Sequence, residues 1–174
     1  AWKLFYEQGY DDTTVDEIVE SSETSKGSFY HYFDGKDALL SSLSYLFDEK
    51  YDALKDSLPE GTFIEKLCHI NQELFLMIEN SISVDLLSRL FSSQLITKGR
   101  RHLLDQDRTY YKLLRDIIQK GRSNNELEDS VSVNEVIKAY ALMERGMMYD
   151  WCLCNGDYSL AQYSKLLLPK FLAN

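Results

Sequence analysis

Residues 14–33 read TVDEIVESSETSKGSFYHYF, a stretch that predicts two short helices joined by a tight turn. Thr14 and Glu17 stand three residues apart, the spacing of a capping box in which each side chain bonds the backbone amide of the other residue. In the second half, Phe29 and Phe33 lie one helical turn apart, so we expect both rings to pack inward. Together these features predict a helix-turn-helix.

The outward face of the second helix carries small, polar and aromatic side chains. Ser25 offers an N-cap hydroxyl, and a rotation of about 100° per residue places Gly27 and His31 opposite Phe29. A helix that enters the major groove of DNA needs glycine for close approach and polar groups for phosphates and base edges. An ordinary solvated surface helix would show the same pattern, so these residues alone leave both interpretations open.

A longer series of positions resembles the DNA-binding segment of the TetR family of bacterial repressors. The resemblance covers roughly the first 47 residues, and its family spacing is kept by Gly9, Tyr10, Thr13 to Val15, Ile18, Ser25 to Phe33 and Lys36 to Leu40. It implies phosphate contacts from Thr14, Tyr32 and Lys36, and a groove-facing side on the second helix. The DNA-binding residues implied in this way are Thr14, Ser25, Lys26, Gly27, Ser28, Tyr30, His31, Tyr32 and Lys36.

The turn between the two helices departs from the family pattern. TetR-like chains commonly have Ala-Gly-Val there, whereas this chain has Ser22-Glu23-Thr24. The family glycine usually takes a left-handed conformation, which costs a residue with a side chain about 1–2 kcal/mol. We therefore expect Glu23 to be left-handed and locally strained.

Helical periodicity continues along the rest of the chain and predicts an all-α protein. We expect residues 1–47 to form the three-helix DNA-binding unit, with its first helix entered midway, and residues 48–174 to form a helical ligand-binding and dimerisation domain. One long helix, Lys36 to about Ser57, should connect the two. The later helices are expected at Thr62 to about Asn80, Asp85 to about Thr97, Leu103 or Asp107 to Lys120, Val133 to about Cys154, and after Asp157.

The last two helices are more apolar than one small core requires. Two neighbouring stripes cover most of the helix that begins at Val133, so it needs burial on two sides. In TetR-like proteins the last two helices pair with their two-fold mates in a four-helix bundle, and the resemblance therefore implies a homodimer. The expected interface residues are Met148, Trp151, Leu160, Tyr163 and Leu167.

Glu144 is a carboxylate on an otherwise apolar helix. Met143, Met147 and Met148 flank it, so it could anchor a ligand in a soft, adaptable pocket. It could instead form a salt bridge with Arg145 or with a neighbouring helix in an ordinary core. The resemblance implies a small-molecule site among the helices after the connecting one. The candidate pocket residues are Phe75, Phe91, Tyr110, Leu114, Tyr140, Met143, Glu144 and Met147.

The charge balance argues against an indiscriminate nucleic-acid binder, because the net charge is −9 and such binders are usually basic. The first 47 residues hold three lysines (Lys3, Lys26 and Lys36) against nine acidic side chains. A DNA-binding unit with this balance must depend on a few well-placed contacts, or on basic residues that precede this segment.

Other functional classes find little support. No run of 18 apolar residues predicts a membrane span. Cys152 and Cys154 would point about 200° apart on a helix, and the three histidines lie in separate elements, so we expect no metal site, no cofactor and no enzymatic activity. The favoured interpretation is a cytoplasmic TetR-like repressor that binds palindromic double-stranded operator DNA as a homodimer and is released by a small-molecule effector. The alternative is a helical interaction protein of the same fold that has lost DNA binding.

Overall fold

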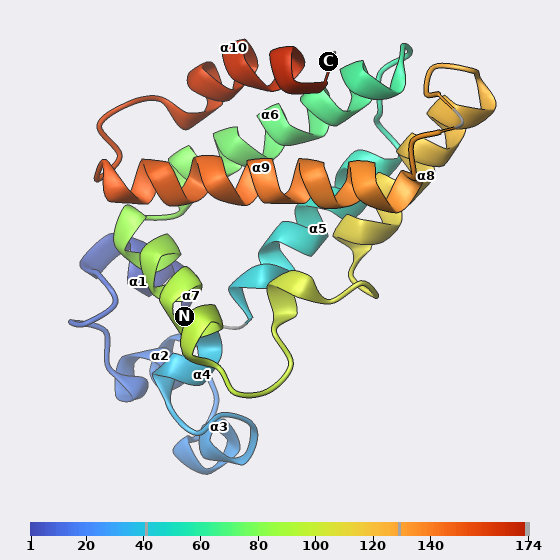
Figure 1. Ribbon diagram of the computed structural model, residues 1–174. Helices are drawn as coiled ribbons and strands as arrows, with labels where there is room; N and C mark the ends of the chain where they lie inside the picture. Colours follow the sequence, from blue (N-terminus) through green and yellow to red (C-terminus); the bar gives the residue numbers. More distant parts are fainter. Residues whose placement is uncertain (41, 129, 173–174) are drawn as a thin grey trace.

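The computed structural model describes residues 1–40, 42–128 and 130–172, and every regular element within these ranges is helical (Figure 1). The predicted all-α class is confirmed. The helices run in the order α1 (Trp2–Gln8), α2 (Val15–Ser21), α3 (Lys26–Tyr32), α4 (Lys36–Leu40), α5 (Leu43–Lys55), α6 (Phe63–Ser81), α7 (Val84–Ile96), the 3-10 helix η1 (His102–Leu104), α8 (Thr109–Ser123), α9 (Val133–Leu153) and α10 (Leu160–Leu172).

The helices form two groups with α7 between them (Figure 1). Helices α1 to α4 gather at one end of the molecule, and α3 lies at its extremity. The larger group contains α5, α6, α8, α9 and α10, with α6 packed along α10 and α8 packed against α5, α6 and α9. Since α7 packs on α9 and also on α4, it spans from the larger group to the smaller one. No helix in the described ranges is long and apolar enough to cross a membrane.

Local capping starts the helices where the sequence predicts. The Thr14 amide donates to the Glu17 carboxylate at 2.7 Å, and the Glu17 amide donates to the Thr14 hydroxyl at 3.2 Å. Thr62 and Glu65 form the same reciprocal pair at the start of α6. The capping box predicted at Thr14 is therefore confirmed, and both boxes satisfy backbone amides that the first turn leaves without a helical partner.

Two helix starts are also held by carboxylates from distant segments. Glu126 accepts a hydrogen bond of 2.6 Å from the Phe63 amide at the start of α6. Glu79, near the end of α6, accepts one of 2.6 Å from the Leu160 amide at the start of α10. Negative charge is favourable at a helix N-terminus, so these contacts stabilise the helices and also fix how the segments lie against one another.

The single connecting helix predicted from Lys36 to about Ser57 is wrong, because α4 ends at Leu40 and α5 begins at Leu43. The Ser42 amide and hydroxyl both donate to the Leu39 carbonyl, at 2.9 and 2.7 Å. A serine side chain that bonds nearby backbone in this way competes with the helical pattern. Position 47 lies inside α5, so we propose that the domain boundary follows α4.

Glu23 adopts the left-handed backbone conformation, with a φ angle of 52°, as the sequence predicts. The preceding turn is closed by the Ser22 amide, which donates to the Ile18 carbonyl at 3.0 Å, and by the Thr24 amide, which donates to the Val19 carbonyl at 3.0 Å. The turn therefore keeps its geometry although it lacks the glycine that would adopt this φ without steric cost.

We expect Glu23→Gly to raise the free energy of unfolding by about 1 kcal/mol. Glycine removes a steric cost of about 1–2 kcal/mol but adds backbone entropy to the unfolded chain. Urea titration would measure the change. Glu20→Gly, at an exposed position inside α2, is the matched control and should destabilise by about 1 kcal/mol. A loss of stability in both variants would contradict the strain at Glu23.

Candidate DNA interface and ligand cavity

Helix α3 presents an exposed polar and aromatic face at the end of the molecule. The Ser25 hydroxyl accepts a hydrogen bond of 3.1 Å from the Ser28 amide and so caps the helix. Phe29 is buried and anchors the inner side, with its ring 5.5 Å from that of Phe33. Tyr32, in contrast, is 75% exposed. The inner aromatic pair therefore orients the outer side chains toward solvent.

Lys26 is an available cation on this face. Its ammonium pairs with Asp16 at 2.7 Å, and its side chain remains 62% exposed. The hydrogen bond from Lys26 to Asp16 and the charge of that carboxylate raise the pKa of Lys26. Because an exposed ion pair contributes little to stability, a phosphate can replace Asp16 at small cost.

Lys36 is engaged inside the protein. Its ammonium donates to the backbone carbonyls of Tyr10 at 2.7 Å, Asp11 at 3.0 Å and Thr13 at 3.0 Å. It also lies 4.6 Å from the centroid of the Tyr10 ring. An ammonium group has three N–H donors, and all three are used here. We therefore withdraw the phosphate contact predicted for Lys36 and assign this side chain to holding the turn between α1 and α2.

Arg89 of α7 also contacts the turn between α1 and α2. Its guanidinium pairs with Asp11 at 2.6 Å and with Asp85 at 2.9 Å, and it lies 4.8 Å from the centroid of the Tyr10 ring. The Tyr10 hydroxyl donates to Asp37 of α4. The turn between α1 and α2 is thus tied to both α4 and α7.

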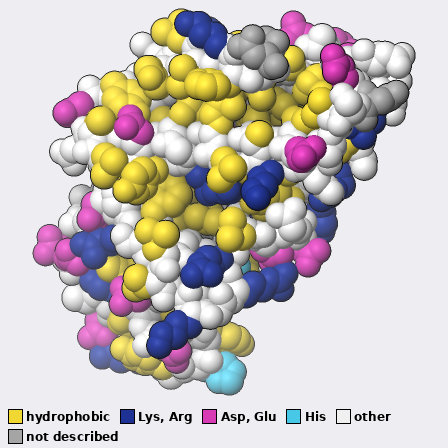
Figure 2. All heavy atoms as spheres, in the orientation of Figure 1, with side chains coloured by type: hydrophobic (Ala, Val, Ile, Leu, Met, Phe, Trp, Pro, Cys, Tyr) yellow, Lys and Arg dark blue, Asp and Glu magenta, His cyan; other side chains and the backbone are white. Residues whose placement is uncertain are grey.

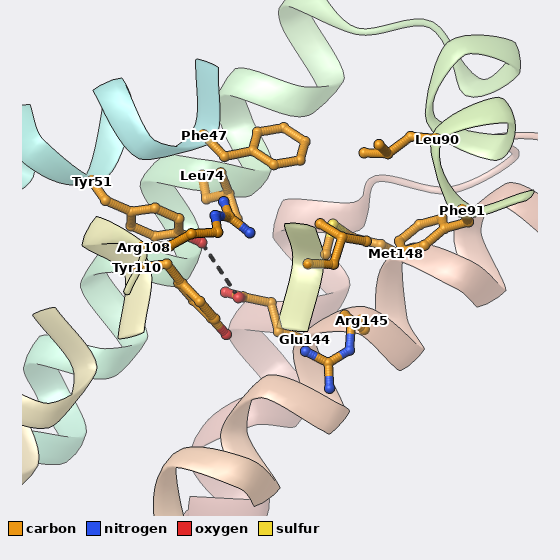
Figure 3. Close-up of a pocket in the computed structure, with 11 residues that line it drawn as sticks. Phe47, Tyr51, Leu74, Leu90, Phe91, Arg108, Tyr110, Glu144, Arg145 and Met148 are labelled. Carbon is orange, nitrogen blue, oxygen red and sulfur yellow. Dashed lines mark hydrogen bonds between the residues drawn. The ribbon is translucent and has the colours of Figure 1, made fainter. Parts of the chain in front are cut away.

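A small cavity, here called the Glu144 cavity, lies between α5, α6, α7, α8 and α9 (Figure 3). Its volume is about 30 Å³, which is room for little more than a water molecule. It is lined by Phe47, Tyr51, Leu74, Leu90, Phe91, Leu103, Arg108, Tyr110, Glu144, Arg145 and Met148. A larger ligand would therefore have to displace the surrounding helices or bind on the surface of the protein.

Glu144 is the polar centre of this cavity and is only 2% exposed. One carboxylate oxygen accepts hydrogen bonds from the Asn71 amide at 3.0 Å and the Tyr140 hydroxyl at 3.1 Å. The other accepts from the Tyr51 hydroxyl at 3.4 Å, the contact dashed in Figure 3. Burial raises the pKa of Glu144, and the hydrogen bonds oppose this rise only in part.

The two arginines that line the cavity have different partners. Arg108 pairs with Asp48 through two hydrogen bonds of 2.9 and 3.0 Å. Arg145 points away from Glu144 in Figure 3 and donates to the Tyr111 hydroxyl at 3.3 Å. The pairing of Glu144 with Arg145 that the sequence left open is not formed. Within the described ranges, Arg145 has no carboxylate partner.

Comparison with known proteins agrees with the helix-turn-helix geometry. Residues 1–43 match the family model described as bacterial regulatory proteins, tetR family. Residues 1–43 are thus similar to the DNA-binding segment of TetR-family regulators. The HTH-type transcriptional regulator YuxN of Bacillus subtilis is 42% identical over 62 residues, which are 35% of this chain and only 21% of YuxN. HbdR of Aromatoleum sp., also an HTH-type transcriptional regulator, is 26% identical over 192 residues, covering 99% of this chain and 77% of HbdR.

A solved structure shares the fold over nearly the whole chain. The transcriptional regulator FadR from Bacillus subtilis, in complex with stearoyl-CoA, superposes with a TM-score of 0.70. The two chains are 19% identical, and the match covers 99% of this chain and 93% of FadR. At this identity the likeness concerns the fold.

The structure brings most of the predicted DNA-contacting residues together. They lie at the N-terminus of α2 or on α3, and all are exposed: Thr14, Ser25, Lys26, Gly27, Ser28, Tyr30, His31 and Tyr32. Among the predicted DNA-contacting residues, Lys36 alone binds the backbone carbonyls of a turn inside the protein. The sequence could not reveal this because its three carbonyl partners come from the turn before α2, more than 20 residues earlier.

The predicted ligand residues separate into two sets. Phe91, Tyr110 and Glu144 line the Glu144 cavity, and Tyr140 bonds Glu144. The others do not line it, and we remove them from the site: Phe75, Leu114, Met143 and Met147. Phe47 and Tyr51 were missed, although their helical spacing on the inner face of α5 is visible in the sequence.

Three of the predicted dimer residues belong to the core of a single chain. Met148, Trp151 and Leu160 are buried because α9 is packed by α7, α8 and α10 of the same chain. Tyr163 is exposed and Leu167 half-buried, so both remain available. A different apolar surface is exposed on these helices (Figure 2), and it includes Leu142, Tyr149, Leu153, Leu166 and Phe171.

We expect Glu144→Gln to remove a pH dependence of stability. Because burial raises the pKa of folded Glu144 above its ordinary value of 4.5, the folded state holds the proton more tightly than the unfolded chain does. The contribution is therefore fully favourable below pH 4.5 and is lost as the pH rises through the folded pKa. Glutamine keeps an acceptor for Asn71 and does not titrate.

Urea midpoints measured from acidic to mildly alkaline pH would test this expectation. The advantage of Glu144→Gln over the wild type should grow as the pH rises. Parallel curves for the two proteins would show that Glu144 does not titrate differently on folding.

Proposed function

We propose that this protein is a one-component transcriptional repressor that binds palindromic operator DNA as a homodimer and is released by a small-molecule effector. It acts by binding, in the cytoplasm, without catalysis or a cofactor. The observation that carries the proposal is the exposed face of α3, which is capped by Ser25, anchored by Phe29 and placed at the extremity of the molecule. A short helix presented in this way fits the major groove.

A second copy is expected on the exposed apolar surface of α9 and α10. On α9 the outward positions Leu142, Gly146, Tyr149 and Leu153 follow one another at helical spacing. A contiguous apolar surface of this kind is costly to leave in water. Two-fold pairing here would join α9 and α10 of both subunits in a four-helix bundle and set the distance between the two α3 helices.

Helix α7 offers a route from an effector to the DNA-binding unit. Leu90 and Phe91 line the Glu144 cavity, while the neighbouring Arg89 holds Asp11 in the turn between α1 and α2. An effector that displaces α7 would therefore shift this turn and the α3 helix that depends on it. FadR, which has the same fold and holds stearoyl-CoA, supports a ligand site among these helices.

The alternative, an interaction protein without DNA binding, is supported by the acidic balance of the first 47 residues. It can be separated from the repressor by experiment. The upstream DNA of the protein's own gene provides the test sequence, and duplex DNA of scrambled sequence provides the comparison. Absence of any preference for the upstream DNA would favour the interaction protein.

We expect Lys26→Ala and Lys36→Ala to differ in kind. Lys26→Ala should lower affinity for the upstream DNA and reduce the salt slope by about 0.9 per half-site, because one phosphate contact is lost. Lys36→Ala should instead lower the free energy of unfolding by about 2 kcal/mol, because three carbonyls lose a charged donor. Fluorescence anisotropy at several salt concentrations and urea titration would measure the two effects.

Two results would contradict the effects expected for Lys26→Ala and Lys36→Ala. A salt slope unchanged by Lys26→Ala would remove this lysine from the interface. A lower salt slope for Lys36→Ala at unchanged stability would restore the phosphate contact that the structure argues against.

We expect Leu142→Arg to convert the dimer to a monomer, because a buried unpaired charge would face the two-fold mate. Tyr45→Arg, at an exposed position of α5, is the control and should remain dimeric. Light scattering would give both masses. A monomeric wild-type chain at micromolar concentration, or a dimeric Leu142→Arg, would rule out this interface.

A further inference from the structure

Two surface cavities flank Arg145 and meet at this residue and at Leu104. The first, here called the apolar groove, has a volume of about 660 Å³ and lies between α7, η1 and α9. Hydrocarbon from Phe91, Leu95 and Leu103 forms much of its surface. The second, here called the basic groove, has a volume of about 440 Å³ and lies between η1, α8 and α9.

The charges on these two grooves have one sign. Arg101 and Arg145 line the apolar groove, and Arg115, Lys138 and Arg145 line the basic groove. Among the residues that the structure describes, no aspartate or glutamate lines either groove. The whole chain has 28 acidic residues and a net charge of −9, so the absence of carboxylates from both linings is informative.

Among the described residues, two of these cations lack the carboxylate partners that neutralise a neighbouring arginine. Arg100 pairs with Asp105 at 2.6 Å and with Asp107 at 3.2 Å. The adjacent Arg101 instead donates to the Gln94 carbonyl at 2.8 Å, and Arg115 donates to the Asn134 side chain at 2.8 Å. In the described part of the chain, neither forms an ion pair.

We propose that the two grooves bind one amphiphilic anion, with its hydrocarbon chain in the apolar groove and a multiply charged, phosphate-bearing head in the basic groove. Arg145 stands at the junction, where the chain meets the head. This inference rests on the proposed function, since it names the chemical class of the effector. A cationic ligand would be repelled by the four cations that line the grooves, and an uncharged hydrocarbon would leave the basic groove without a partner.

The placement also connects the ligand to α7. Phe91 lines both the apolar groove and the Glu144 cavity. A chain that enters the apolar groove therefore contacts α7 two residues from Arg89, whose guanidinium holds the turn before α2. Binding in the grooves and displacement of the DNA-binding unit would thus act through one helix.

The test measures direct binding to the full chain in the absence of DNA, by isothermal titration calorimetry below the micelle concentration of each probe. The probes are lauroyl-CoA, coenzyme A without a chain, laurate and dodecyltrimethylammonium. Lauroyl-CoA should bind at least tenfold more tightly than either coenzyme A or laurate, because only it occupies both grooves. Its affinity should fall as salt is added. Dodecyltrimethylammonium should bind more weakly than laurate.

Variants locate the site. Arg145→Gln should weaken the binding of lauroyl-CoA about tenfold, because the loss of a hydrogen bond to a charged group has an effect of this size. Lys138→Gln, at an exposed position that disturbs no core contact, should weaken lauroyl-CoA and leave laurate unchanged, because a single carboxylate at the junction does not reach the basic groove. Arg100→Gln is the control, because Arg100 lines neither groove, and it should not change either affinity.

The contrary results are distinct from a failure of the proposed function. Equal affinity of wild type and Arg145→Gln for lauroyl-CoA, equal affinity for laurate and dodecyltrimethylammonium, or preferential binding to phosphatidylglycerol vesicles would overturn the inference. Selective binding of the upstream DNA by the same protein would still support the proposed repressor function. Conversely, tight binding of lauroyl-CoA without any preference for the upstream DNA would support the inferred ligand class and contradict the repressor function.

Discussion

The position of the DNA-binding unit depends on the three hydrogen bonds that the Lys36 ammonium donates to the turn between α1 and α2. Backbone carbonyls in an irregular turn have no regular partners, and a charged donor satisfies several of them at once. Arg89 adds an ion pair from α7 to the same turn. Because α2 begins directly after this turn, the angle at which α3 is presented follows from side chains that do not face DNA.

Glu144 places a different constraint on the larger group of helices. A buried carboxylate is tolerated only when donors surround it, and Asn71, Tyr140 and Tyr51 come from three different helices to do so. The Asn71 side chain in turn accepts a hydrogen bond from Ser164 of α10. The network therefore specifies how α5, α6, α9 and α10 lie together, while the raised pKa of Glu144 shows that the charged form is costly there.

Helix α9 combines roles that compete for its surface. Its inner side supplies Glu144 and core residues, one flank supplies Arg145 and Lys138 to the grooves, and its outer side is apolar. Gly146 and Tyr149 line the apolar groove and also lie on the surface proposed for the second subunit. A ligand chain in this groove would therefore lie next to the dimer contact, which gives effector binding a second way to alter the spacing of the two α3 helices.

Local features of this protein could be predicted from the sequence by itself. The all-α class, the capping boxes at Thr14 and Thr62 and the left-handed Glu23 depend on residues a few positions apart, and so does the exposed face of α3. Only the tertiary structure could place Lys36 on distant carbonyls and bury Met148 and Trp151 inside one chain. It also ends α4 at Leu40 and brings arginines together around two grooves. Periodicity shows which side of a helix is apolar, but it cannot show whether that side meets its own chain, a partner or a ligand, because packing partners are chosen by contacts between segments far apart in the sequence.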